Sequence, residues 1–156
     1  MSIEWFRLPK EIKHWYGSME ADYAYTLGVA GEKFFMEIKE NGRLMGAKCP
    51  KCNVVYLPPK LYCENCFEAL SEWIEIKDEG YIYTYTIAHL DEDGKPSEKP
   101  VIYALIKFDG VKGGLIHKLG EVKPENVKVG MRVKAVWKPK EEREGNITDI
   151  LYFKPV

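Results

Sequence analysis

The sequence predicts a mainly β protein with N-terminal helices, in which a helical lead-in precedes a small cysteine-held ribbon and a C-terminal five-stranded barrel of the OB type. Three observations support this prediction. Apolar residues recur at helical spacing before position 42, all four cysteines lie between positions 49 and 66, and strand-like runs fill much of the chain from position 71 onward. We therefore expect a helical segment at residues 1–42, the ribbon at 43–77 and the OB-fold domain at 78–156.

Two helices are expected in the N-terminal segment. Pro9 suits a first helical turn, and residues 12–25 interleave aromatic and charged side chains with one glycine. A second helix is expected from Val29 to Glu40. The dipeptide Asn41-Gly42 that follows is a helix-stop signal.

The N-terminal segment carries more aromatic residues than two short helices can bury by themselves. They are Trp5, Phe6, Trp15, Tyr16, Tyr23, Tyr25, Phe34 and Phe35. These rings either pack on the rest of the chain or face a partner, and the sequence leaves both possibilities open. Because Trp and Tyr often anchor protein interfaces, this segment is the first place to look for a partner.

The four cysteines form two CxxC pairs, Cys49 with Cys52 and Cys63 with Cys66, separated by ten residues. Four thiolates from two tight knuckles suit a closed tetrahedral site for structural zinc. Asn53 follows the first pair, where such knuckles often turn into the left-handed region that Asn tolerates. The equivalent residue of the second pair is Phe67, so we expect that knuckle to turn differently.

Disulfides, an iron site and a redox-active pair are the alternatives to a zinc site for these cysteines. Disulfides would require an oxidising compartment, whereas the sequence shows no signal peptide and no apolar run long enough to span a membrane, so we expect a cytoplasmic protein. Iron in a rubredoxin-like site uses the same ligands and stays open as an alternative. A thioredoxin-type redox pair is disfavoured because both pairs lie among turn residues.

Composition limits the classes of partner and the source. Lys and Arg number 23 against 24 Asp and Glu, without the basic excess that is typical of a nucleic-acid binder. Glutamine is absent while Lys and Glu dominate the charged residues, a pattern that favours the cytosol of a hyperthermophile over compositional chance. A cysteine-held piece of about 30 residues could not bury enough surface to fold without its metal.

Strand-like runs dominate the second half of the chain. A short strand is expected at 71–76, and five more are expected at 81–87, 101–108, 113–119, 131–137 and 147–153. Five strands from Tyr81 onward, with turn signals between them, fit a small OB-type barrel. A fragment of a β-sandwich is the alternative, but five strands would give it little to pack against.

A family resemblance follows from these motifs taken together. The order of a helical lead-in, a rubredoxin-like zinc ribbon with Pro58-Pro59 between its knuckles, a Gly-Tyr-Ile-Tyr-Thr-Tyr-Thr strand and a barrel containing residues 129–133 resembles the DUF35 family of acyl-CoA-associated proteins. The resemblance covers nearly the whole chain. The first knuckle of that family usually ends in Gly where this chain has Asn53, and Asn can adopt the same backbone conformation.

The resemblance implies an accessory role beside acyl-CoA enzymes. Archaeal members of the family are encoded near thiolase and HMG-CoA synthase of the mevalonate pathway, and they look like scaffolds that hold both enzymes so that a CoA thioester can pass between them. Other relatives pair with thiolase-like or hydratase-like subunits in sterol side-chain degradation. The resemblance therefore implies a thiolase and an HMG-CoA synthase as partners.

The residues themselves argue against intrinsic catalysis. With all cysteines assigned to the metal, no thiol is left for the acyl-enzyme chemistry of a thiolase or a synthase. His14, His89 and His117 are the only candidate bases at neutral pH, and each has a structural explanation as a surface, strand-end or partly buried residue. We expect a protein that is not an enzyme.

A scaffold could nevertheless contact CoA, whose phosphates suit lysines and free backbone N–H groups and whose arm suits ring surfaces. The candidate CoA-binding residues are Tyr83, Tyr85, Lys112, Gly113, Gly114 and Lys118. The two tyrosines are expected to share one strand face. A plain hairpin turn, solvated lysines and a barrel wall explain the same residues and are favoured.

Three functions from different classes remain, in decreasing order of support. The first is a non-catalytic scaffold for acyl-CoA enzymes, which predicts a large assembly once the enzymes are co-expressed. The second is a nucleic-acid binder, because OB barrels and zinc ribbons both serve that role; salt-dependent gel shifts would reveal it. The third is a stand-alone CoA-thioester enzyme, which turnover by the purified chain would reveal.

Overall fold

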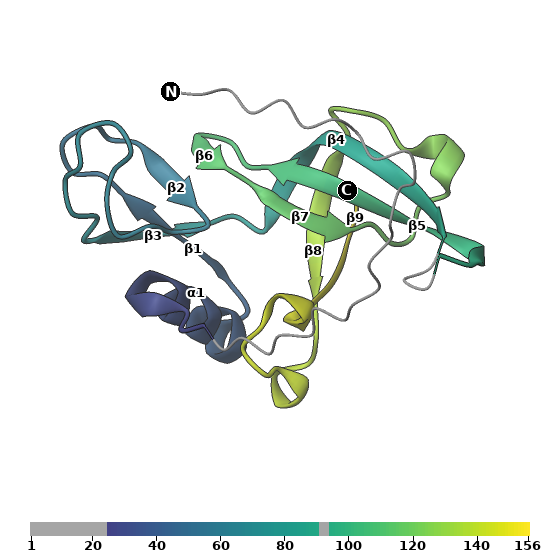
Figure 1. Ribbon diagram of the computed structural model, residues 1–156, viewed down its shortest axis with the longest axis horizontal. Helices are drawn as coiled ribbons and strands as arrows, with labels where there is room; N and C mark the ends of the chain where they lie inside the picture. The colour runs from purple at the N-terminus through teal and green to yellow at the C-terminus, as the bar shows by residue number, and fades with distance from the viewer. Residues whose placement is uncertain (1–24, 91–93) are drawn as a thin grey trace, which may run out of the picture.

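The computed structural model describes residues 25–90 and 94–156, and these residues form one α-helix and nine strands in two sheets (Figure 1). The mainly β class with a helix near its N-terminus is therefore confirmed. The first expected helix, with Pro9, His14 and Trp15, lies outside the described residues.

The helix α1 runs from Gly28 to Asn41, close to the predicted span. Ala30, Phe34 and Ile38 recur every four residues, which puts them on one face, and all three are buried. Gly42 ends the helix in the left-handed region at φ 61°. The stop signal predicted there is confirmed. Within the described part of the chain, no helix has the length and the apolar character needed to cross a membrane.

The ribbon side of the molecule is a four-stranded sheet, on the left of Figure 1. Its strands in spatial order are β3 (Glu72–Ile76), β1 (Leu44–Lys48), β2 (Val55–Leu57) and β6 (Val111–Gly113). The central strand β1 pairs antiparallel with β2 and β3, whereas β6 runs parallel to β2. The sheet therefore gains its last strand from the segment that the sequence assigned to the barrel.

The second sheet has five strands and forms the barrel. In spatial order they are β7 (Leu115–Lys118), β5 (Pro96–Lys107), β4 (Glu79–Leu90), β8 (Arg132–Trp137) and β9 (Ile150–Pro155). Its two edge strands meet through a bridge between Leu119 and Phe153, where the N–H of Gly120 donates to the Phe153 carbonyl at 2.9 Å. The predicted five-stranded OB barrel is confirmed.

The number of strands is larger than predicted. Strands β1 and β2 flank the first cysteine pair and were not expected, because such short strands carry little local pattern. The single strand expected at 113–119 is two strands, β6 and β7. The strand expected at 147–153 begins with a 3₁₀ turn, η3 (Ile147–Asp149), and only β9 continues as a strand.

A pair of glycines explains why the strand expected at 113–119 is divided into β6 and β7. A side chain at Gly113 would lie 2.1 Å from the Leu57 carbonyl oxygen, and one at Gly114 would lie 2.5 Å from the Ile106 carbonyl oxygen. Both glycines have positive φ, at 106° and 159°. The chain can therefore pass from the ribbon sheet to the barrel at this point only because two residues without side chains stand there.

Helix, ribbon and barrel share one hydrophobic core. Phe34 and Ile38 of α1, Leu44 and Leu57 of the ribbon strands, and Phe153 of the barrel belong to the same buried cluster. A second, smaller cluster surrounds the cysteines and contains Ala47, Cys49, Tyr56, Cys63 and Leu70. The ribbon is thus held by the main core on one side and by its own small core on the other.

Candidate functional site

The four cysteine sulfurs lie together at the tip of the ribbon. All four Sγ atoms are within 4.8 Å of one another, and those of Cys49 and Cys66 are 3.6 Å apart. A tetrahedral zinc with Zn–S bonds of about 2.3 Å requires sulfur–sulfur distances of about 3.8 Å. Cys49 and Cys63 are buried, and Cys52 and Cys66 are half-buried. The arrangement fits one tetrahedral ion.

The two knuckles have the same backbone design. The N–H groups of Asn53 and Phe67 donate to the carbonyl oxygens of Cys49 and Cys63, at 2.9 and 3.0 Å. Asn53 has φ 56° and Phe67 has φ 58°, so both are left-handed. The expectation that Phe67 turns differently is wrong. Its ring is 79% exposed and meets no packed neighbour that forbids the turn, so backbone hydrogen bonding decides the conformation.

Hydrogen bonds shift the pKa values of the Cys63 and Cys52 thiols in opposite directions. The hydrogen bond with the Tyr56 hydroxyl lowers the pKa of Cys63 to about 6. Hydrogen bonding to Cys66 and burial raise the pKa of Cys52 to about 12. All four thiols therefore cannot ionise together at neutral pH unless a cation lies between them. A divalent ion with an affinity for sulfur removes this conflict, which is why the donor set fits zinc.

A second feature of the molecule is an exposed apolar surface centred on Ile116 of β7, whose side chain is 72% exposed. A hollow of about 440 Å³ beside Ile116 extends to Phe35 of α1 and to Pro58 and Pro59 of the ribbon. On the other side of Ile116, a hollow of about 220 Å³ extends to Tyr103 and Leu105 on the outer side of β5. No charged residue lines either hollow among those described.

We call this surface the Ile116 face and define it by Phe35, Pro59, Tyr103, Leu105, Ile116 and Ile147. A third hollow of about 310 Å³ connects Ile116, Tyr103 and Ile147 along its rim. Among the described residues, Lys118 is the one charged residue that lines these three hollows, although 30% of the residues of the chain are charged. Helix, ribbon and barrel all contribute to it, so it exists only when the three parts are folded together.

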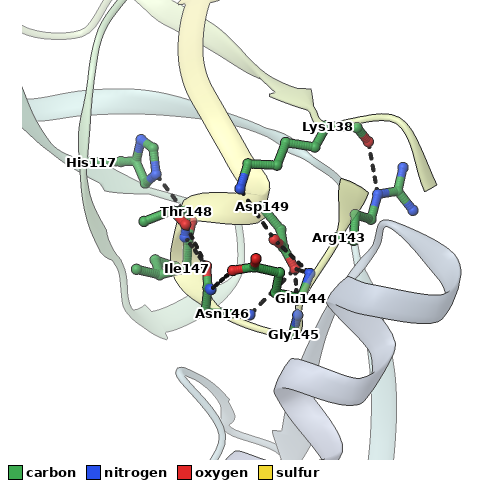
Figure 2. A network of polar contacts seen from close by, with 9 residues as sticks. All are labelled: His117, Lys138, Arg143, Glu144, Gly145, Asn146, Ile147, Thr148 and Asp149. Carbon is green, nitrogen blue, oxygen red and sulfur yellow. Dashed lines mark hydrogen bonds and ion pairs between the residues drawn. The ribbon is translucent and has the colours of Figure 1, made fainter. Parts of the chain in front are cut away.

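Ile147 is held at this face by a buried carboxylate (Figure 2). Asp149 is fully buried and accepts hydrogen bonds from the backbone N–H groups of Glu144, Gly145 and Asn146, the shortest at 2.7 Å. The Lys138 ammonium lies 3.7 Å from the same carboxylate. Burial alone would raise the pKa of Asp149, but these N–H groups and Lys138 lower it overall.

The Asp149 network is a capping box around η3, in which the Asn146 side chain accepts from the Thr148 N–H at 2.9 Å. The sequence pattern predicted a strand at residues 147–149 and gave no capping box there. An Asn followed three residues later by an Asp was the available signal.

His117 lies beside the Ile116 face, and its side chain is buried, as the alternation along β7 predicted. Its ring nitrogens lie 3.3 Å from the carbonyl oxygens of Lys118 and Ile147. Burial lowers the pKa of His117, so the imidazole is neutral at pH 7. The described contacts of the ring are with carbonyl oxygens and Phe153, which is the environment of a structural histidine.

The candidate CoA-binding residues lie on separate parts of the molecule. Tyr83 is on the outer side of β4 with the Lys107 ammonium 3.9 Å from its ring centre. Lys112 and Gly113 lie in β6 of the ribbon sheet, and Gly114 follows directly. Lys118 is exposed on β7. The Lys112 ammonium is paired with Glu64 at 2.7 Å, so its charge already has a partner.

The expectation that Tyr83 and Tyr85 share a face is wrong. The pairing of β4 with β5 shifts register between Ile82 and Thr84, which marks a bulge at Tyr83. After the bulge the alternation is inverted, so Tyr83 is exposed while Tyr85 packs against the main core. Tyr85 is therefore largely a barrel-wall residue.

The comparisons with known proteins agree with this architecture. Residues 36–71 match the rubredoxin-like zinc ribbon domain of ChsH2, and residues 73–138 match the C-terminal OB-fold domain of ChsH2. A DUF35 domain-containing scaffold protein of Methanocaldococcus jannaschii is 32% identical over 123 residues, which are 76% of this chain and 86% of that protein. A probable enoyl-CoA hydratase alpha subunit of Thermomonospora curvata is 27% identical over 67% of this chain and 32% of its own length.

Two solved structures are similar to most of the chain. A DUF35 family protein of unknown function from Sulfolobus solfataricus has 41% identity and a TM-score of 0.62, covering 70% of this chain and 78% of that one. The Ltp2-ChsH2(DUF35) aldolase has 25% identity and a TM-score of 0.60, covering 80% of this chain and 93% of that one.

Proposed function

Because this chain belongs to the DUF35 family of zinc-ribbon and OB-fold proteins, we propose that it is a non-catalytic scaffold that binds enzymes of acyl-CoA metabolism. Two findings on relatives support an accessory role. Relatives are described as scaffold proteins, and one similar structure is that of an aldolase formed by Ltp2 and a DUF35 protein. A further relative is described as an enoyl-CoA hydratase subunit, which connects the family with CoA thioesters.

The proposed partners are a thiolase and an HMG-CoA synthase. This choice rests on the resemblance of the chain to archaeal members of the family, and DUF35 scaffold relatives come from Methanocaldococcus jannaschii and Pyrococcus furiosus. In this proposal the scaffold holds both enzymes in the cytoplasm, and a CoA thioester passes from one to the other.

The single observation that carries the proposal is the Ile116 face. Large exposed apolar patches are rare on monomeric proteins. Where they occur, they usually mark protein interaction sites. The central part of a protein interface is depleted of charged residues and enriched in aromatic ones, and the hollows around Ile116 have both properties. We therefore propose that an acyl-CoA enzyme binds to the Ile116 face.

The metal has a structural role in this proposal. Cys49, Cys52, Cys63 and Cys66 would hold zinc, which would supply the folding energy that a ribbon of this size lacks. Pro58 and Pro59 lie between the two knuckles and border the Ile116 face. Loss of the metal would therefore distort the docking face without touching any chemical step.

Direct contact with CoA stays a prediction. Lys118 lies at the rim of the Ile116 face, and Tyr83 with Lys107 offers a ring and a cation on the outer side of the barrel. Lys112, Gly113 and Gly114 have structural roles at the junction of the two sheets. The proposed domain limits, 1–42, 43–77 and 78–156, likewise stay predictions.

Co-expression tests the proposal. The chain would be produced with the thiolase and HMG-CoA synthase of its own host and analysed by gel filtration with light scattering. We expect one large assembly for the natural sequence and its loss for Ile116→Lys, because a buried unpaired ammonium at an interface core is costly. Val129→Lys is the matched control, since Val129 is also exposed, at 66%, but lies away from the face.

Two results would contradict the proposal. If neither enzyme co-elutes with the natural sequence, the choice of partners is wrong. If Ile116→Lys and Val129→Lys assemble equally well, the docking face has been wrongly located.

A further inference from the structure

One of the four cysteine sulfurs has a contact that the other three lack among the side-chain contacts described. The Tyr56 hydroxyl oxygen lies 3.3 Å from the Cys63 Sγ atom. Tyr56 is 1% exposed, so neither water nor another solvent molecule competes for this hydroxyl. The contact is therefore part of the small core that surrounds the four sulfurs.

The direction of this hydrogen bond follows from the other contact of the hydroxyl. The backbone N–H of Glu64 lies 3.3 Å from the same oxygen and can only donate to it. The hydroxyl proton is then available for a second acceptor. A metal-bound Cys63 is a thiolate, which has no proton to give, so the Tyr56 hydroxyl donates to the sulfur.

The ring that carries this hydroxyl is contacted from β6 as well as from the segment between the two knuckles. The Lys60 and Lys112 ammonium groups lie 5.6 and 5.5 Å from the ring centre, within the range of cation–π contacts. Both ammonium groups pair with the carboxylate of Glu64, the residue next to Cys63. Lys112 belongs to β6 and stands opposite Tyr56 in the parallel pairing of β2 with β6.

We propose that Tyr56 is a positioning residue of the metal centre, whose hydroxyl donates to the Cys63 sulfur and whose ring is fixed by Lys112, so that β6, the last strand of the ribbon sheet, strengthens metal retention. Hydrogen bonds to a metal ligand fix its orientation toward the metal. Loss of such a partner typically costs about 10- to 100-fold in metal affinity. This inference concerns the metal centre and holds whichever protein the scaffold binds.

Tyr56→Phe tests the proposal because it removes one oxygen atom and keeps the ring. In the full-length protein, competition with a zinc chelator should show an affinity about 10- to 100-fold weaker than that of the natural sequence. Tyr62→Phe is the matched control, since Tyr62 lies in the same ribbon but its side chain is 62% exposed. The control should retain the natural affinity.

A spectroscopic readout separates positioning from general loss of stability. In the cobalt-substituted protein, a hydrogen bond lowers the energy of the sulfur lone pairs and raises the energy of the sulfur-to-cobalt charge-transfer band. Tyr56→Phe should therefore move this band to lower energy. If Tyr56→Phe and Tyr62→Phe are indistinguishable in both zinc affinity and cobalt spectrum, the proposal is wrong.

A second variant keeps the test decisive if Tyr56→Phe does not fold. Lys112→Met removes the charge from β6 but retains a chain of similar length, and it should weaken zinc binding to a smaller extent. Lys107→Met is its control, because the Lys107 ammonium contacts the Tyr83 ring, away from the metal centre. Equal zinc affinity of these two variants would overturn the role assigned to β6.

Discussion

The backbone N–H of Gly114 donates to the carbonyl oxygen of Leu57 at 2.9 Å, at the point where the chain passes from the ribbon sheet to the barrel. Leu57 precedes the Pro58-Pro59 segment and is buried in the main core. The hydrogen bond therefore connects the segment between the metal knuckles directly with the first residues of β7. Ile116 and Pro59, which lie on the two sides of this junction, border the same hollow.

This junction predicts different costs for two glycine substitutions. Gly113→Ala would put a methyl group 2.1 Å from the Leu57 carbonyl oxygen, so the backbone must move, and we expect a loss of at least about 3 kcal/mol in the free energy of unfolding. Gly110 has φ 72° but open space around it. Gly110→Ala should therefore cost only about 1–2 kcal/mol in the free energy of unfolding. Chemical denaturation measures both. Equal costs would mean that the close approach at Gly113 is relieved without strain.

Metal removal should act on the ribbon first. Cys49→Ser should release the metal and unfold the ribbon, because the binding free energy of such a site is also folding free energy. Hydrogen exchange should accelerate in β1, β2 and β3, while β8 and β9 keep their protection. Chelation and re-addition of zinc to the natural sequence is the control. A metal-free Cys49→Ser protein that still forms the full enzyme assembly would contradict the structural role of the metal.

Asp149 should be important for stability, because its fully buried carboxylate closes the short turn η3. Asp149→Asn places an NH₂ or a single carbonyl against three backbone N–H donors, and we expect a loss of about 2 kcal/mol or more in the free energy of unfolding at pH 7. Because the folded-state pKa is lowered below 3.8, the carboxylate contributes fully above pH 3.8 and loses its contribution only as the pH falls through the folded-state pKa.

The difference between Asp149→Asn and the natural sequence should accordingly stay constant between pH 7 and pH 5 in denaturant titrations. Asn146→Ala tests the other half of the capping box and should cost less, since it removes a neutral hydrogen-bond acceptor. If the titrations are continued below pH 3.8 and the difference still does not decline, the Asp149 pKa is not lowered.

His117 should make the stability sensitive to mildly acidic pH, where the contribution of Asp149 stays constant. Burial lowers its pKa below 6.5, so above pH 6.5 the imidazole is neutral in both the folded and the unfolded chain and has no effect on stability. As the pH falls from 6.5 toward the folded-state pKa, the unfolded chain takes up a proton that the folded one does not. Stability should then fall, by at most about 1.4 kcal/mol per pH unit.

His117→Gln should remove this dependence, whereas His89→Gln at an exposed position should retain it. Melting temperatures at pH 7 and pH 5 measure the effect. An identical pH dependence in both variants would assign the acid sensitivity to other groups.

Local patterns in the sequence were sufficient for much of the fold. The end of α1 at Gly42 follows from a single left-handed glycine, and the spacing of Cys49, Cys52, Cys63 and Cys66 brings four sulfurs together through two short hydrogen-bonded knuckles. Each of these features depends on interactions within a few residues. They can therefore be predicted from sequence neighbours alone.

Features that depend on distant contacts were not predictable in this way. The parallel pairing of β6 with β2 joins residues more than 50 positions apart through only three register pairs. The bulge that exposes Tyr83 and turns Tyr85 inward is visible only in the pairing of β4 with β5. A signal for the Ile116 face was present, however, because Ile116 is apolar at a position where the alternation between Leu115 and His117 calls for an outward polar residue.

The N-terminal segment provides the last test. Removing residues 1–24 should leave the described fold intact, because the described core draws on residues from Ala30 onward and α1 begins at Gly28. The removed segment contains Trp5, Phe6 and Trp15, which are residue types that anchor protein interfaces, so the affinity for the partner enzymes should fall. Calorimetry gives the stability, and a pull-down with purified enzymes gives the affinity. If stability falls while affinity is unchanged, these aromatic residues pack within the chain and the Ile116 face alone carries the docking.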